Sequence, residues 1–136
     1  MNGLSGPFLI VHNIGHARDA VATAKELGRP VTLVSAPGAA ASIGPEVFKK
    51  IIDAVRNEFP TANVNAVLDC GSNPGPALQA IRHGCENIRL DAEVDVLNKL
   101  RDMAVGEVLD GAPLDAYDMA DGSAGVAAWL QGQEKQ

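Results

Sequence analysis

The sequence has few aromatic residues and few cysteines: its 136 residues include one Trp, one Tyr, three Phe and two Cys. So few cysteines exclude a scaffold held together by disulfides. If Cys70 closes a strand and Cys85 follows the next helix, the two lie at opposite ends of that helix. Disulfide-linked Cα atoms lie within about 7 Å of each other, so we predict two free thiols.

Long apolar runs and basic clusters are also missing. No run approaches the roughly 20 residues that a membrane span needs, and residues 1–7 lack the basic start of a signal peptide. The formal net charge is -6, with Lys and Arg scattered along the chain, which disfavours nucleic-acid binding. We expect a cytoplasmic protein that has neither a membrane nor a nucleic acid as partner.

Short apolar runs, rich in Val, Leu and Ile, alternate with segments of helical spacing. A chain of this length fits one domain, and such alternation indicates a parallel sheet with right-handed crossovers. We expect strands at 8–11, 31–34, 64–68, 88–90 and 107–109, and helices at 16–27, from Pro45 to before Pro60, from about Ser72 to Gly84, and at 93–104.

This pattern predicts an α/β fold, namely a three-layer αβα sandwich with a sheet of four or five mainly parallel strands. A flavodoxin-like arrangement is favoured, and a half-barrel that pairs with itself is the second choice. Residues 1–111 would form the α/β domain. Residues 112–136 would form a C-terminal extension that packs on it, with a disordered tail from Gln131 onward.

An apolar run that ends in Leu, Asp and a small residue occurs three times. If each run is a strand of one parallel sheet, the aspartates line up along its carboxyl edge, where open α/β folds bind ligands. The alternative is that each aspartate makes a turn or caps the following helix. The three endings are Leu68-Asp69-Cys70, Leu90-Asp91-Ala92 and Leu109-Asp110-Gly111.

Asp69 is the best candidate for a functional carboxylate at this edge, as an acid/base group or as a metal ligand. His12 ends the first strand, and we predict that it faces the same cleft as a second acid/base group. The alternative for His12 is a polar side chain satisfied within its turn. Cys70 comes just before a helix start that would stabilise a thiolate, but a buried, inert thiol is the default for this residue.

The turn Gly71-Ser72-Asn73-Pro74-Gly75 leads into a helix and would present backbone N–H groups to an anion. It lacks the lysine of a P-loop and the glycine spacing of a dinucleotide site, so the sequence identifies no cofactor. We expect Arg89 to lie near a strand end or in a salt bridge. The predicted ligand-binding residues are Ser35, Gly71, Ser72, Asn73 and Asp91.

One segment resembles a known family. The run from Ala77 to Gly84 (ALQAIRHG), followed by Ile88-Arg89-Leu90-Asp91, resembles one βα repeat of (βα)-barrel aldolases and phosphoribosyltransferases. The resemblance implies a strand–helix–strand layout, with catalytic or phosphate-binding groups at the strand ends. No predicted strand here ends in lysine, so the Schiff-base lysine of those barrels has no counterpart.

Two functions follow from these patterns. The leading hypothesis is a small-molecule binding or lyase/isomerase-type domain that acts on an anionic metabolite at the carboxyl edge. The alternative is a non-catalytic interaction domain, in which the Ala-rich loop 36–44 or the segment around Trp129 docks on a partner or on a second copy of the chain.

Overall fold

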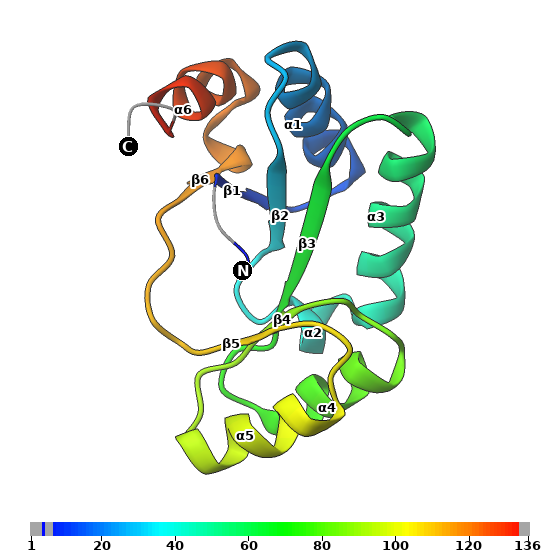
Figure 1. The fold of residues 1–136 in the computed structure, drawn as a ribbon, viewed down its shortest axis with the longest axis vertical. Helices are drawn as coiled ribbons and strands as arrows, with labels where there is room; N and C mark the ends of the chain where they lie inside the picture. The colour runs from blue at the N-terminus through cyan, green and yellow to red at the C-terminus, as the bar shows by residue number, and fades with distance from the viewer. Residues whose placement is uncertain (1–3, 5–6, 134–136) are drawn as a thin grey trace. The chain divides into compact units, whose positions relative to one another are not determined.

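The computed structural model describes residue 4 and residues 7–133 (Figure 1). It has the predicted α/β fold: one open sheet of six parallel strands with helices, consistent with a three-layer sandwich. The strand order is β5-β4-β3-β2-β1-β6. The strands are β1 (Phe8–Val11), β2 (Val31–Ser35), β3 (Val64–Asp69), β4 (Ile88–Arg89), β5 (Val108–Leu109) and β6 (Ala116–Asp118).

The strand count differs from the prediction of four or five because of β6, which lies in the segment 112–136 assigned to an extension. β6 pairs in parallel with β1, so that Phe8 lies opposite Ala116 and Ile10 opposite Asp118. Ala116-Tyr117-Asp118 contains no Val, Leu or Ile, so the search for short apolar runs missed this strand.

The helices follow the predicted spacing closely. The structure also contains a one-turn helix, α2, inside the predicted loop 36–44, and the last helix extends through Gln133, so residues 131–133 are helical where disorder was expected. Residues 134–136, the rest of the predicted tail, lie outside the described part. The α-helices are α1 (Ile14–Glu26), α2 (Ala39–Ser42), α3 (Pro45–Glu58), α4 (Pro74–Arg82), α5 (Val94–Met103) and α6 (Val126–Gln133).

The chain divides into two compact units. The first contains the residues up to Val34, Ile51–Asn65 and the residues from Leu114 onward, and the second contains Ser35–Lys50 and Ala66–Pro113. Each has its own apolar packing.

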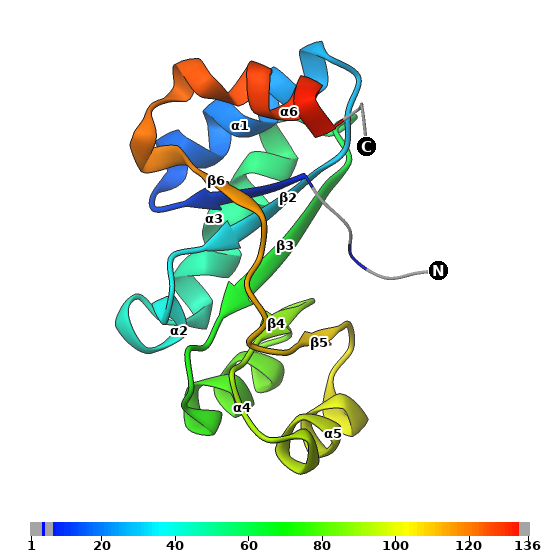
Figure 2. The ribbon, with the colours of Figure 1, turned by 90° about the vertical axis from the view of Figure 1, so that its left-hand side faces the viewer.

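In the first unit, α1 buries a stripe of small residues at helical spacing, and α6 packs against α1 (Figures 1 and 2). Asn13 caps α1 by accepting a hydrogen bond from the backbone N–H of His16, so the helix starts two residues before the predicted position. Gly28, with φ of 66°, follows its end. The buried residues are Ala17, Ala20, Val21 and Ala24 of α1 and Val126 and Leu130 of α6.

In the second unit, α4 and α5 lie side by side (Figures 1 and 2). Asn73 caps α4, and Pro74 occupies its first position. Leu68 and Leu90 are fully buried, together with Leu97 and Leu100 of α5 at low exposure. Both cysteines are free, which confirms the prediction. In the part of the chain that the structure describes, no helix is long and apolar enough to cross a membrane.

Candidate functional site

The carboxyl ends of β1 and β6 meet where the strand order changes direction. β1 has β2 on one side, and the chain reaches the other side of β1 only with β6. Such a reversal is the point at which open α/β sheets place their ligands. His12 follows β1 directly and Asp118 is the last residue of β6, so both lie at this point of the first unit.

His12 and Asp118 form a hydrogen-bonded pair. Nε2 of His12 lies 2.7 Å from Oδ1 of Asp118, and their side chains are 34% and 38% exposed. The same carboxylate oxygen accepts a hydrogen bond of 2.9 Å from the backbone N–H of Ala120. The backbone of Ala120 therefore holds the Asp118 carboxylate, while both side chains stay partly accessible to solvent.

The protonation state of this pair follows from the surroundings of Asp118. The backbone N–H of Ala120 lowers the pKa of the Asp118 carboxyl below its ordinary value of 3.8, and the hydrogen bond and charge of His12 lower it further, against desolvation, which raises it. The carboxylate is thus ionised at neutral pH and accepts the Nε2–H proton of His12. In the neutral imidazole, Nδ1 then carries the lone pair that a general base needs.

Two hydrogen bonds fix the position of His16. Its Nδ1 accepts a hydrogen bond of 3.1 Å from the backbone N–H of His12, while its own backbone N–H donates to Oδ1 of Asn13 at 2.9 Å. A backbone N–H can only donate, so Nδ1 of His16 carries a lone pair and the proton of the neutral ring is on Nε2. The rings of His12 and His16 are edge-to-face, with centroids 5.5 Å apart.

The start of α1 also offers hydrogen-bond donors at this point. Of its first four N–H groups, those of His16 and Ala17 are accepted by Asn13. Those of Ile14 and Gly15 have no partner among the residues that the structure describes, as is usual for the first turn of a helix. Further along α1, Oδ2 of Asp19 accepts a hydrogen bond of 2.7 Å from Oγ of Ser123.

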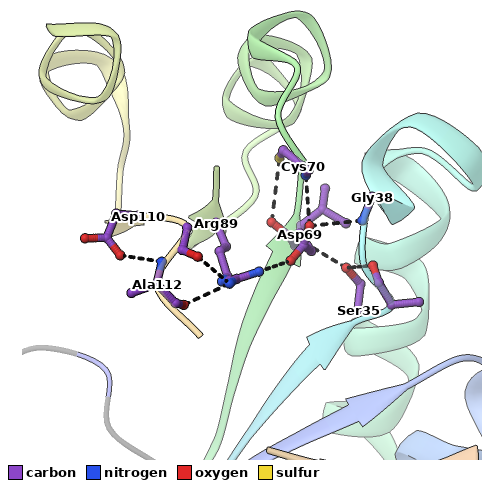
Figure 3. A network of polar contacts seen from close by, with 11 residues as sticks. Ser35, Gly38, Asp69, Cys70, Arg89, Asp110 and Ala112 are labelled. Carbon is purple, nitrogen blue, oxygen red and sulfur yellow. Dashed lines mark hydrogen bonds and ion pairs between the residues drawn. The ribbon is translucent and has the colours of Figure 1, made fainter. Parts of the chain in front are cut away.

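Asp69, the leading prediction, lies in the second unit and is almost completely buried, at 4% exposure. Its Oδ1 accepts hydrogen bonds from the backbone N–H groups of Gly38, at 3.0 Å, and Gly71, at 2.8 Å. Its Oδ2 lies 2.7 Å from Nη1 of Arg89 (Figure 3). Its own backbone N–H donates to Oγ of Ser35 at 2.8 Å.

Arg89 connects the carboxylate of Asp69 to the loop that follows β5. It lies opposite Asp69 in the register of β3 and β4, and its Nη2 donates to the carbonyl oxygens of Gly111, at 3.1 Å, and Ala112, at 2.8 Å (Figure 3). The salt bridge expected for Arg89 is confirmed. Since the Asp69 carboxylate is buried and bound by three donors, this geometry favours a structural role over proton transfer.

The other predicted ligand-binding residues make local contacts in the second unit. The N–H of Gly71 is used by Asp69, and Oδ1 of Asn73 accepts from the N–H of Gly75 at 3.0 Å. Because Pro74 and Pro76 have no N–H, the first turn of α4 has few donors left for an anion. Ser35 is buried, while Ser72 and Asp91 are exposed, and the backbone N–H of Asp91 donates to the carbonyl of Gly71 at 2.8 Å.

The surroundings of Cys70 are those of a buried, inert thiol, the alternative to a reactive thiolate. Its thiol is buried and lies 3.6 Å from the carbonyl oxygen of Leu68. Burial, with a further contribution from the charges of Asp69 and Cys85, raises the pKa of the Cys70 thiol to about 12. A thiolate is the nucleophilic form of cysteine, so the start of α4 does not activate this residue.

The structure thus assigns the two predicted acid/base residues to different units, and their convergence in one cleft stays a prediction. Sequence reasoning missed Asp118 and the role of His16. A signal for Asp118 was present, because Ala116-Tyr117-Asp118 is another short run ending in aspartate. In the described residues, no three His, Cys, Asp or Glu side chains are grouped as a metal ion would require.

The sequence was also compared with known proteins. No protein-family model matches the chain, and no curated protein matches it either.

Proposed function

We propose that this protein binds a small anionic metabolite at the carboxyl ends of β1 and β6, and that His12 transfers a proton to or from it. The observation that carries the proposal is the pair of His12 and Asp118, which are joined at 2.7 Å at the point where the strand order reverses. An ionised aspartate that accepts from one imidazole nitrogen fixes the ring and leaves the other nitrogen as a base.

Two sets of donors in the first unit support an anionic ligand, and the loss of donors at α4 favours this unit over the predicted site. The N–H groups of Ile14 and Gly15 lie at the positive end of the α1 dipole. The Nε2–H group of His16 is a further donor. The N-terminus of α4, where the sequence predicted the anion, has lost donors to Pro74, Pro76 and the contacts of Gly71 and Gly75. The donors available in α1 therefore favour the first unit.

The three histidines of the chain provide a direct test. The Cε1–H signals of His12, His16 and His83 are followed by NMR while inorganic phosphate or pyruvate is added. We expect the signals of His12 and His16 to shift to saturation and that of His83, which lies in the second unit beside Glu46, to stay in place. His12→Gln and Asp118→Asn are expected to weaken the shift of His16. Equal drift of all three signals, or no shift, would refute the proposed binding site.

One observation favours the alternative, a non-catalytic domain that associates with a second copy. Three apolar side chains at the ends of α5 and just after it are exposed: Val94 at 62%, Met103 at 51% and Val105 at 84%. They belong to the unit that contains β5, which lies at one end of the strand order, and edge strands and exposed apolar side chains are both sites of association. Sedimentation of the full chain and of Val105→Asp would test this: a concentration-dependent dimer that the substitution abolishes supports it.

A further inference from the structure

The hydrogen bond between the backbone N–H of His12 and Nδ1 of His16 has a chemical consequence for the proposed site. It fixes the tautomer of His16, so that the neutral ring presents Nε2–H as a donor. Asp118 fixes the opposite tautomer of His12, which presents Nδ1 as an acceptor. Two adjacent imidazoles thus have different roles, one basic and one donating.

We propose that His16 is a second catalytic residue, which donates a hydrogen bond from Nε2 to a carbonyl oxygen, and that the substrate is an enolisable carbonyl compound with an anionic group. This inference rests on the proposed function above. The carbonyl oxygen and the adjacent carbon of such a compound are separated by only two covalent bonds. The two imidazole rings, with centroids 5.5 Å apart, are close enough to contact one small ligand.

The proposed step is balanced without a further reactant. Nδ1 of His12 removes a proton from the carbon next to the carbonyl, and the electron pair of that C–H bond forms a C=C bond. The carbonyl oxygen becomes an enolate oxygen, whose charge the Nε2–H group of His16 stabilises. Return of a proton from His12 to carbon restores the carbonyl, and in D₂O the returning nucleus is deuterium.

The surroundings of His16 fit the role of a neutral donor. Its Nδ1 is occupied by the backbone N–H of His12, which leaves Nε2–H as the group that can donate to a ligand. A neutral imidazole can polarise a carbonyl through its N–H group, and the donor then stabilises the charge that develops on the enolate oxygen. The titratable groups near it are the imidazole of His12 and the carboxylate of Asp118.

The test is the exchange of carbon-bound protons of pyruvate and dihydroxyacetone phosphate for deuterium, followed by ¹H NMR at saturating concentrations. His16→Gln and His16→Met form a matched pair: both are uncharged and similar in length, but only glutamine keeps an N–H donor. We expect the wild type to accelerate exchange of one of these probes, His12→Gln to abolish the acceleration, and His16→Met to exchange about 10²-fold more slowly than His16→Gln.

Structural effects are separated by thermal unfolding. His16→Gln and His16→Glu both keep a side-chain acceptor for the N–H of His12. If His16→Met does not fold, His16→Glu serves as the donor-free variant, with the same loss expected in the maximal exchange rate. His83→Gln is the control for an exposed histidine outside the site, and its exchange should equal that of the wild type.

The outcomes separate the two proposals. If pyruvate or phosphate shifts the His12 and His16 signals but the wild type accelerates no exchange, enolisation is refuted and anion binding stands. If exchange depends on His12 but His16→Met and His16→Glu exchange at the rate of His16→Gln, the role of His16 is refuted and that of His12 stands. If no anion binds at these histidines, the proposed function itself fails.

Discussion

His12 and Asp118 are separated by 106 positions in the sequence, and their side chains meet at 2.7 Å. His12 directly follows β1 and Asp118 is the last residue of β6, and the parallel pairing of these two strands brings the residues together. The candidate site in the first unit is therefore a product of strand order rather than of any contiguous motif.

Replacement of Asp118 should change the pH dependence of stability. The pKa of Asp118 is lower in the native protein than its ordinary value of 3.8, so the unfolded chain binds more protons in this range. The carboxylate then stabilises the native state above about pH 4, and this contribution is lost as the pH falls through the native pKa. Urea unfolding should show a difference between wild type and Asp118→Asn at pH 7 that shrinks toward roughly pH 3. A difference that is constant over this range would contradict the prediction.

Asp69→Asn should destabilise the second unit strongly. The substitution leaves Arg89 without its carboxylate and turns an amide toward the N–H groups of Gly38 and Gly71. Loss of one member of a buried ion pair costs about 3 kcal/mol or more, which urea unfolding would measure. Asp91→Asn is the control, because Asp91 ends the next run in the same sequence pattern but is exposed. Its effect should stay within about 0.5 kcal/mol.

Gly71→Ala should also destabilise the protein. Gly71 has a φ of 63°, which residues with a Cβ rarely adopt, and its N–H donates to Asp69. The left-handed conformation costs about 1–2 kcal/mol for alanine. Gly132→Ala is the matched control, since Gly132 lies in α6 with no atom near its added Cβ, and alanine should be neutral there or stabilising by up to about 1 kcal/mol. Equal effects of the two substitutions would rule out backbone strain as the cause.

The Cys70 thiol should react slowly in the native protein. A rise of its pKa from 9.0 to about 12 reduces the thiolate fraction at pH 8 by a factor of about 10³. Alkylation of the Cys85→Ala variant with iodoacetamide should therefore be slow in buffer and fast in concentrated urea. Rapid labelling without denaturant would show that the start of α4 activates this thiol after all.

The sequence predicted those parts of the structure that depend on local patterns. The helix from Pro45 and the strand at 64–68 follow from spacing and turn chemistry. The salt bridge of Arg89 followed from the cost of burying a charge between apolar neighbours, although its partner was not predicted.

The candidate site could be predicted only in part, because its contacts join distant segments. His12 was recognised from its place at a strand end, but its partner Asp118 depends on β6, a strand of three residues. The tautomers of His12 and His16 depend on single hydrogen bonds, which no spacing reveals. Asp69 was placed correctly at the end of a strand, but the three donors that surround it come from Gly38, Gly71 and Arg89, of which only Gly71 lies nearby in the chain.

The pairing of β1 with β6 also sets the order of events during synthesis. The ribosome completes β1 and α1 early, yet the carboxylate that orients His12 is added more than a hundred residues later. Until β6 has been made, the nascent chain carries an imidazole without its partner and an unpaired edge on β1. An incomplete chain therefore lacks the carboxylate that orients His12 until the segment containing β6 has been made.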